Sequence, residues 1–474
     1  MKNYDLIVIG LGSAGLTLSI SMAKAGFKVL GIDKDARSIG GDCLNYGCVP
    51  SKALIHVSRL VYAAKEAEPF GIKTSGKIDI KKVTDYIFEK QELIREHESP
   101  EYLEKEGVEL ALGWAKFVDA HTVEVDGEKY KGKRIVIATG SVPRKLQTKG
   151  IEQVEYSFTN ENIFKIDFLP KRFLFVGAGP INCELGQAFS RLGSEVRIIN
   201  RGDRILGKEH LKVSALMEER LRLEGIEIIN QAEVQEFISD RRALIQGKNG
   251  EQEEIDFDAL MVGVGRIASI SSLQVEKAGI QLDEKGRLIV SDTFQTSVKH
   301  IYACGDVAGK GQFSHLAAEQ ASIILSNFFN PFTKAKAGRK PIPAVTYTEP
   351  EVATFGYSEQ ELKKMGKKYQ IIEHDMHGDR ATVSDFRYGK MLIYLEKGRT
   401  ILGEKLLGGT IVAPHAGEMV QEFIMTQNQG KGFLNIMGTI HPYPTATNDA
   451  KAAFLDHVIG KIGTKLQRVL GWLY

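Results

Sequence analysis

Two cysteines stand five residues apart in the stretch 40–52, which reads Gly-Gly-Asp-Cys-Leu-Asn-Tyr-Gly-Cys-Val-Pro-Ser-Lys. Four intervening residues can close a small ring, so Cys43 and Cys48 could cycle between a dithiol and a disulfide. Pro50 suits the first turn of a helix, where unpaired backbone N–H groups would favour a thiolate at Cys48. Lys52 adds a positive charge nearby. We interpret the pair as a redox-active disulfide, and the alternative is two ordinary cysteines.

A glycine-rich turn precedes the cysteines. The apolar run 4–9 leads into the sequence GLGSAG at 10–15, a helix predicted over 16–25 and a strand predicted over 28–32 that ends in Asp33. Glycines at this spacing allow a tight turn and the close approach of a pyrophosphate, which the helix N-terminus faces, and the acid can accept from a ribose hydroxyl. The pattern predicts a dinucleotide site. Its candidate contacts are Gly10, Gly12, Ser13, Ala14, Gly15, Asp33 and Lys34.

A second copy of this fingerprint begins about 167 residues later and forms an internal repeat. The strand 173–176 runs into GAGPIN at 177–182, where Asn182 takes the place of the third glycine. We therefore expect helix and strand to sit further apart there or to repack. The next predicted strand, 195–199, ends in Asn200 and Arg201 instead of an acid, which favours a 2′-phosphate and so NADPH over NADH. The candidate contacts are Gly177, Gly179, Pro180, Ile181, Asn200 and Arg201.

The remaining segments give weaker signals. A helix is predicted over 53–64, and the highly charged stretch 78–106 is predicted to be helical and solvated. Alternating runs over 114–130 predict a β-meander. An apolar strand at 301–306 contains Cys304, which we expect to be a small core residue. A new domain is predicted to begin at the proline-bearing stretch 340–343.

Composition bounds the functional classes. The chain has 474 residues, enough for about two to four domains, and a net charge of +2, which gives no reason to expect a nucleic-acid partner. It has four cysteines, too few for a secreted disulfide framework. No signal-peptide pattern is apparent, and no apolar run reaches the ~18 residues that would span a bilayer. We expect a cytoplasmic, soluble protein.

The order of these pieces resembles that of the class I pyridine nucleotide-disulfide oxidoreductases, which include dihydrolipoamide dehydrogenase and mercuric reductase. The resemblance implies an α/β fold with two Rossmann-like domains, one for FAD and one for NAD(P), and an α+β C-terminal domain that forms a homodimer. The implied boundaries are 1–150 and 271–340 for FAD, 151–270 for NAD(P) and 341–474 for the interface. The matching pieces are 10–15, 40–52, 138–140, 177–184, 263–266, 302–306 and 343–356.

The same resemblance implies an electron path. NAD(P)H would reduce the flavin, and the flavin would reduce the disulfide, with Cys48 as the thiolate next to the ring and Cys43 as the thiol that meets the acceptor. Lys52 and Glu184 would form an ion pair beside the flavin and the nicotinamide. Asp306 would accept from the ribityl hydroxyls. The further cofactor contacts implied are Gly41, Asp42, Lys52, Ala138, Thr139, Gly140, Gly265, Gly305 and Ala317.

The C-terminal segment departs from the family pattern. Members that act on thiols carry a catalytic histidine there, supplied by the partner subunit, and a glutamate five residues later. In this chain the two positions hold Tyr443 and Asn448, and His441 lies two residues earlier. Tyrosine, with an ordinary pKa near ~10, is a poor base at neutral pH. Either His441 substitutes from a shifted position, or the enzyme does not need this proton transfer.

The electron acceptor therefore stays open. A tyrosine near this point is typical of mercuric reductases, but the further C-terminal cysteine pair of those enzymes is absent, since no cysteine follows Cys304. The alternatives are a mercuric or other metal-ion reductase, a dihydrolipoamide dehydrogenase, and a non-catalytic, redox-sensing flavoprotein. Intact cysteines, Lys52 and Glu184 favour an enzyme.

The C-terminal tail 459–474 is predicted to be an amphipathic, basic helix. Its apolar face would hold Ile459, Ile462, Leu466, Val469, Leu470 and Leu473. Such a helix could lie on a membrane surface, although packing against the dimer is favoured.

Overall fold

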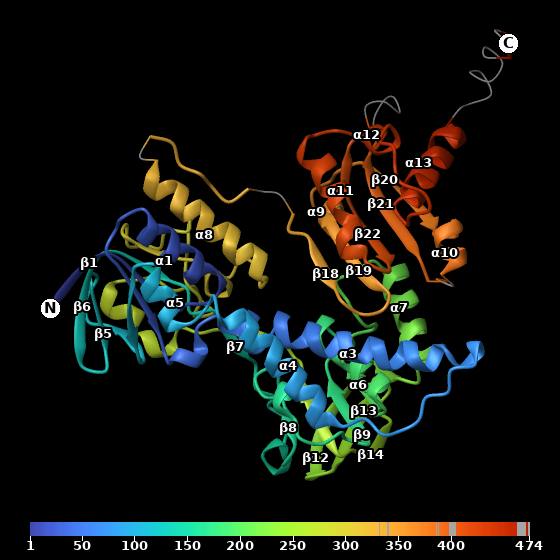
Figure 1. Cartoon of the computed structure of the whole chain (residues 1–474), viewed down its shortest axis with the longest axis horizontal. Coiled ribbons are helices and arrows are strands. Elements are labelled where there is room, and N and C mark those ends of the chain that lie inside the picture. The colour runs from blue at the N-terminus through green and yellow to red at the C-terminus, as the bar shows by residue number, and fades with distance from the viewer. Residues whose placement is uncertain are drawn as a thin grey trace. The chain divides into compact units, whose positions relative to one another are not determined.

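The chain folds into two compact units in a computed structural model (Figure 1) that describes residues 1–330, 332–338, 341–384, 386, 388–397, 404–461 and 471–472. The first unit comprises residues 1–171 and 258–339, and the second comprises 172–257 and 340–474. Each unit is built from two segments that are distant in sequence. The four domain boundaries drawn from the family resemblance remain a prediction.

A seven-stranded sheet organises the first unit. Its order is β3 (Val108–Leu112), β2 (Val29–Asp33), β1 (Lys2–Ile9), β6 (Glu128–Ile137), β5 (Thr122–Val125) and β4 (Ala115–Phe117), and β17 (Ile301–Ala303) also pairs with β6. The pairs around β1 are parallel, whereas β4, β5 and β6 form the predicted antiparallel meander. Strands buried on both faces read as continuous apolar runs, as the sequence 6–9 does.

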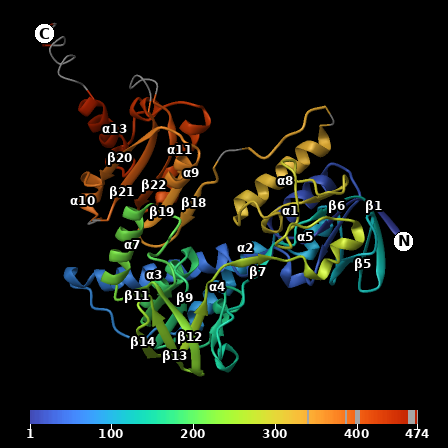
Figure 2. The same ribbon diagram turned by 180° about the vertical axis from the view of Figure 1, so that it is seen from behind.

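The two faces of β1 enter different cores. Ile7 and Ile9 pack with the meander, whereas Leu6 and Val8 pack beneath α1 (Ser13–Lys24) and α8 (Ser314–Phe329). These two helices lie side by side in both views (Figures 1 and 2). Both helices therefore cover the same face of the sheet in the first unit.

Helices carry the cysteines. The short α2 (Gly41–Asn45) is followed by α3 (Cys48–Glu66), and α4 (Ile80–Arg95) packs along α3. Other elements of this unit are α5 (Pro100–Lys105), the parallel pair β8 (Ser157–Phe158) and β15 (Ala259–Val262), and the antiparallel pair β7 (Ser141–Pro143) and β16 (Arg266–Ala268). Helix α3 begins at Cys48, so Pro50 lies in its first turn, as the sequence predicted.

The second unit begins with another strand, turn and helix. The parallel strands β9 (Arg172–Val176), β10 (Glu195–Asn200) and β11 (Glu227–Asn230) alternate with α6 (Pro180–Leu192) and α7 (Leu211–Leu223). An antiparallel sheet of β12 (Ala232–Ser239), β13 (Arg242–Gly247) and β14 (Gln252–Asp256) follows. The helix after the second glycine turn starts at Pro180, a favoured residue at the first helical position.

The C-terminal part of the second unit is a five-stranded antiparallel sheet covered by helices. Its order is β18 (Ala344–Thr346), β19 (Glu351–Gly356), β22 (Leu406–Ala413), β21 (Lys390–Glu396) and β20 (Tyr369–Asp375). Helix α11 (Ala416–Asn428) packs on β19 and β22, as Figure 1 shows. The other helices are α9 (Glu359–Lys364), α10 (Asp379–Val383), α12 (Leu434–Met437) and α13 (Asn448–Lys461).

The α/β fold class is confirmed. Among the described residues, no helix is long and apolar enough to cross a membrane. The amphipathic tail predicted over 459–474 lies outside the described residues except for 459–461 and 471–472.

Candidate active site

The cysteine stretch forms a tight loop between two helices. Gly40, with φ +90°, is the N-cap of α2, which carries Cys43, while Cys48 is the first residue of α3. At Gly47, between the helices, a Cβ would lie 2.8 Å from the Asp42 carbonyl oxygen, so a side chain does not fit. A side-chain hydrogen bond with Cys48 is the main cause that raises the pKa of the Cys43 thiol, and burial is the second. The structure therefore brings the two predicted redox sulfurs together.

One face of α4 holds this loop, which the sequence did not predict. Gln91 Nε2 donates to the carbonyl oxygens of Leu44, at 2.8 Å, and Asn45, at 3.0 Å. Arg95 Nη2 donates to Asn45 Oδ1 at 2.7 Å, and Arg95 Nη1 donates to the Ile39 carbonyl at 3.5 Å. The prediction of a solvated helix over this stretch was wrong for this face. The signal was a glutamine and an arginine four residues apart, which share one face of a helix.

The first glycine turn is packed too closely for side chains at two of its glycines. A Cβ at Gly10, where φ is +96°, would lie 2.4 Å from the Ala138 carbonyl oxygen, and a Cβ at Gly15 would lie 1.9 Å from the Gly10 carbonyl oxygen. Asp33 Oδ2 accepts from the Leu11 N–H at 2.8 Å, and its other oxygen accepts from Lys34 N–H. Burial raises the pKa of Asp33. A bare backbone turn at a helix N-terminus, closed by an acid, fits the pyrophosphate and ribose of FAD.

Arg266 connects three of the predicted motifs within the first unit. Its Nε donates to Ser141 Oγ at 2.7 Å, and its Nη2 donates to the Ser141 carbonyl at 2.8 Å and to Asp42 beside Cys43. Ser141 Oγ in turn donates to Asp306 Oδ2 at 2.5 Å. The sequence analysis included Arg266 in the motif 263–266 but named only Gly265 as a cofactor contact. Because one guanidinium binds both Asp42 and Ser141, the cysteine loop and the segment that follows β6 are held together.

The other predicted flavin contacts lie at the same edge of the sheet. Ala138, Thr139 and Gly140 follow β6, and Gly305 and Asp306 follow β17, the strand beside it. Thr139 Oγ1 donates to the Ser269 carbonyl at 2.6 Å. Ala317 lies in the first turn of α8. Carboxyl ends of parallel strands meet at one edge, which is where such sheets bind ligands. These residues would hold FAD.

The second glycine turn begins with the same backbone conformation as the first but has a side chain at the position of the third glycine. Gly177 has φ +98°, Gly179 precedes α6 and Pro180 opens it. Asn182 is fully buried, and its amide nitrogen donates to the carbonyls of Val176 at 2.9 Å and Gly177 at 2.8 Å. The turn has therefore repacked around a side chain, one of the two outcomes expected.

The residues that follow β10 are also arranged differently from Asp33. Asn200 Nδ2 donates to the Arg204 carbonyl at 2.8 Å and to Asn230 Oδ1 at 2.7 Å, so this side chain holds the loop after the strand. Arg201 is exposed. These features leave a cation, and no acid, at the position that would meet a nucleotide's ribose.

Glu184 is held by the C-terminal part of its own unit. Its side chain is buried, and Oε1 accepts from the Tyr347 N–H at 2.8 Å. One turn later on α6, Gln187 accepts from the Glu349 N–H at 2.7 Å and donates to the Glu349 carbonyl at 2.9 Å. Lys52 is on α3 of the first unit. The Lys52–Glu184 ion pair therefore stays a prediction.

The two C-terminal candidates have opposite environments. His441 is 6% exposed at its side chain, and Nε2 lies 2.9 Å from Glu422 Oε1 while Nδ1 lies 3.2 Å from the Thr439 carbonyl. Tyr443 is 74% exposed, and its hydroxyl donates to Asp379. This hydrogen bond raises the pKa of Tyr443. The tyrosine, and not the histidine, is presented at the surface of the second unit.

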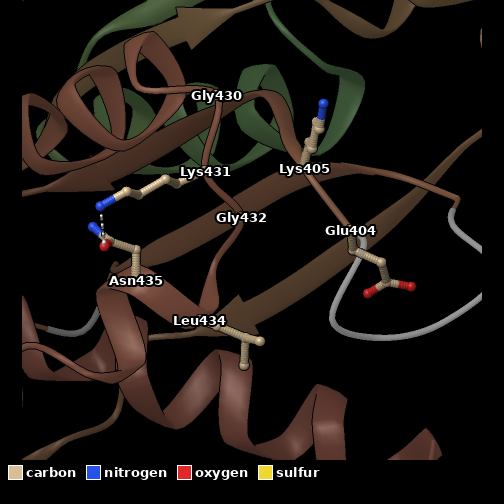
Figure 3. A pocket seen from close by; sticks show the side chains of 7 residues that line it. All are labelled: Glu404, Lys405, Gly430, Lys431, Gly432, Leu434 and Asn435. Atoms are coloured by element: carbon tan, nitrogen blue, oxygen red, sulfur yellow. Dashed lines mark hydrogen bonds between the residues drawn. The ribbon is translucent and has the colours of Figure 1, made fainter.

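A shallow hollow of about 450 Å³ lies elsewhere in the second unit (Figure 3). Lys431 points to Asn435, whereas Lys405 and Glu404 point in other directions. Glu404 is engaged by His457 and Lys461. Because its polar side chains do not converge, this hollow is not a candidate active site. No group of three or more His, Cys, Asp or Glu side chains in the described parts of the chain could hold a metal ion.

Known proteins resemble the whole chain. The family described as pyridine nucleotide-disulphide oxidoreductase matches residues 4–321, and its dimerisation domain matches 342–454. A mercuric reductase of Lysinibacillus sphaericus is 33% identical over 96% of this chain and 82% of its own length. A dihydrolipoyl dehydrogenase of Thermus scotoductus is 33% identical over 94% of this chain and 95% of its own length.

Solved structures agree on the fold. The HOCl-induced flavoprotein disulfide reductase RclA from Escherichia coli has a TM-score of 0.84 at 23% identity, with 95% of this chain and 99% of that chain covered. A Cu(II) complex of its C43S mutant has a TM-score of 0.85 at 23% identity, with 96% and 99% covered. The C-terminal match to a dimerisation domain supports a homodimer. The chain belongs to the pyridine nucleotide-disulphide oxidoreductase family, enzymes that use FAD and NAD(P)H.

Proposed function

We propose that the chain passes electrons from NAD(P)H through FAD to the Cys43–Cys48 disulfide, and from the reduced pair to a thiophilic metal ion, Cu(II) before Hg(II). The observation that carries the choice of acceptor is the exposed Tyr443 at the position of the family's base, with His441 turned inward. A metal ion needs two sulfur ligands and no general base, whereas a thiol substrate needs proton transfer at the interchange sulfur.

The chain's own residues divide the work. FAD, when bound, would accept a hydride from NAD(P)H and deliver two electrons to the disulfide. Cys48 would carry the thiolate, because it begins a 19-residue helix whose free N–H groups stabilise negative charge. Cys43, whose thiol pKa is raised, would stay protonated until an acceptor binds. Lys52 and Glu184 would compensate each other's charge beside the nucleotides.

The acceptor step balances with two metal ions. Two Cu(II) ions each take one electron, the two sulfurs rejoin as a disulfide, and the thiol proton goes to solvent. Two relatives support a metal: one is named mercuric reductase, and the RclA structures include a Cu(II) complex. We place Hg(II) second because no cysteine follows Cys304 to deliver it. Asn200 and Arg201 favour NADPH as the donor.

The test is steady-state NADPH oxidation with Cu(II), Hg(II), lipoamide, a quinone and oxygen as acceptors. We expect Cu(II) to give at least about tenfold higher kcat/KM than lipoamide, and Cys48→Ser to abolish both this turnover and the long-wavelength thiolate-to-flavin absorption. Ser322→Ala, on the exposed face of α8, is the matched control and should change neither. Unchanged Cu(II) turnover in Cys48→Ser would refute the proposal.

Dihydrolipoamide is the second candidate, because His441 and Glu422 form the kind of histidine–carboxylate pair that thiol exchange uses. On the metal hypothesis, dihydrolipoamide oxidation by NAD+ is slow in the wild type and rises in Tyr443→His. Fast wild-type oxidation that His441→Gln abolishes would favour the second candidate.

A further inference from the structure

The sulfur of Cys48 faces two helix N-termini in the first unit. It begins α3, and Cys48 Sγ lies 3.6 Å from Ser314 Oγ, where Ser314 is the first residue of the 16-residue α8. Sulfur hydrogen bonds are longer than those of oxygen because the sulfur atom is larger, so this separation is a contact. Two segments 266 residues apart in sequence thus meet at one redox sulfur.

The chemistry of the pair decides which atom donates. A thiolate has no proton and can only accept, whereas a serine hydroxyl can donate one hydrogen bond. The same hydroxyl also bonds to Cys43, where it opposes the effects that raise the pKa of that thiol. The Ser314 hydroxyl can therefore donate its hydrogen bond to either sulfur, depending on which of the two carries the negative charge.

We propose that Ser314 is a catalytic residue of the disulfide step, whose hydroxyl donates to the Cys48 thiolate and so keeps the negative charge of the opened pair on Cys48. This inference rests on the proposed role of the two cysteines. Helix α8 would then help to position FAD and would also determine which of the two sulfurs carries the negative charge. A hydrogen bond to a charged form favours that form.

Three other ionisable groups near the two cysteines are present in every variant compared. They are Lys52 on α3, Glu98 after α4 and His315 on α8, whereas Cys43 on α2 is replaced by serine in the background used for the test. Glu98 is half-buried, and it raises the pKa of the Cys43 thiol. Because Ser314 is uncharged, its removal changes a hydrogen bond and leaves this set of charges unaltered.

The experiment measures the pKa of Cys48 directly in full-length, FAD-loaded protein. In a Cys43→Ser background, Cys48 is the sole reactive cysteine, since Cys183 and Cys304 are fully buried. The rate of alkylation by iodoacetamide against pH gives the thiolate titration without any need for turnover. The long-wavelength absorption against pH gives the same titration through the flavin.

Ser314→Ala should raise the apparent pKa of Cys48 by about one unit, the size expected for one lost hydrogen bond to a charged group. Ser314→Thr keeps a hydroxyl and should restore it, and Ser322→Ala on the same helix should leave it unchanged. Coincident titrations of Ser314→Ala and its parent would overturn the inference. That result would leave the proposed function intact, because the function is tested separately by the acceptor preference of the wild type and by the metal turnover of Cys48→Ser.

Discussion

The two glycine turns show how one sequence motif can be stabilised in two different ways. Both begin with a glycine at nearly the same φ, +96° at Gly10 and +98° at Gly177. In the first turn Gly15 packs directly against the Gly10 carbonyl, and Asp33 binds the Leu11 N–H. In the second turn a buried asparagine amide fills the gap between helix and strand. The first turn is therefore held by a backbone contact and a carboxylate outside the glycine motif, and the second by a side chain within the motif.

This difference has a functional meaning. The first turn would hold a cofactor that stays bound, and a rigid backbone cradle suits it. The second turn would meet a nucleotide that binds and leaves at every turnover. The strand after it ends in Asn200, which holds its own loop, and in the exposed Arg201. Specificity there can change without disturbing the helix, and four predictions test the contrast.

The largest effect is expected at Gly15. A Cβ there would lie 1.9 Å from the Gly10 carbonyl oxygen, so Gly15→Ala should abolish FAD retention and cost about 3 kcal/mol or more of unfolding free energy. Flavin content after gel filtration and denaturant unfolding measure both. Gly186→Ala on α6 is the matched control, because its new Cβ would meet Ile198 at an ordinary 3.4 Å. If Gly15→Ala protein retained its flavin, the first turn would accommodate a side chain as the second turn does, and the difference between them would not hold.

At Asn182 two substitutions should separate size from hydrogen bonding. Asn182→Asp buries a carboxylate against the carbonyls of Val176 and Gly177, and should destabilise the protein by about 3 kcal/mol. Asn182→Gly restores the missing glycine and should cost only about 1 kcal/mol, because it also removes the unpartnered buried Oδ1. Chemical denaturation measures both values. Equal effects would mean that the amide hydrogen bonds are not what holds this turn.

Glu209 should make the loop after the second turn sensitive to pH. Burial raises the pKa of Glu209 to about 7, and its N–H bonds to Leu206, which in turn bonds to Ala178 of the turn. Because the folded pKa is above the unfolded one, the stability due to the protonated form is complete below pH 4.5 and is lost as the pH rises through 7.

Glu209→Gln should therefore raise the free energy of unfolding at pH 8 by on the order of 2 kcal/mol and change little near pH 4. Glu253→Gln, at an exposed position of β14, is the control. A gain of the same size at both pH values would contradict the assignment. The first turn has no counterpart to this loop, since Asp33 closes it directly.

The smallest effect concerns nucleotide choice. Arg201→Ala should lower the ratio of kcat/KM for NADPH to that for NADH about tenfold, because one cation facing a 2′-phosphate is lost. Steady-state kinetics with both nucleotides measure the ratio. Arg241→Ala removes an exposed arginine of the same unit and should leave it unchanged. An unaltered ratio in Arg201→Ala would mean that Arg201 does not distinguish a ribose that carries a 2′-phosphate from one that does not.

Much of the fold was predictable because its signals are local. Two strand, turn and helix units, the meander and the helix after the cysteines follow from glycine spacing and apolar runs over short stretches. The resemblance to a known family then supplied the homodimer and the cofactors.

What escaped prediction depends on contacts between distant segments. Gln91 and Arg95 bind the cysteine loop from about 50 residues away, and Arg266 reaches Asp42 over 224 residues. The opposite exposure of His441 and Tyr443 could not be read from their spacing, because the carboxylates that bind them come from α11 and α10. Side chains that bind backbone carbonyls of a loop leave no periodic pattern in the sequence.

The anchoring of the cysteine loop by α4 has one more consequence. Gln91 and Arg95 hold the loop through its carbonyl groups and Asn45, not through the sulfurs, so we expect the same hydrogen bonds whether an S–S bond is open or closed. Little reorganisation would then accompany a two-electron cycle. The barrier to such a cycle would be set by sulfur chemistry and not by refolding of the loop, and the reduced protein should withstand proteolysis as well as the oxidised one.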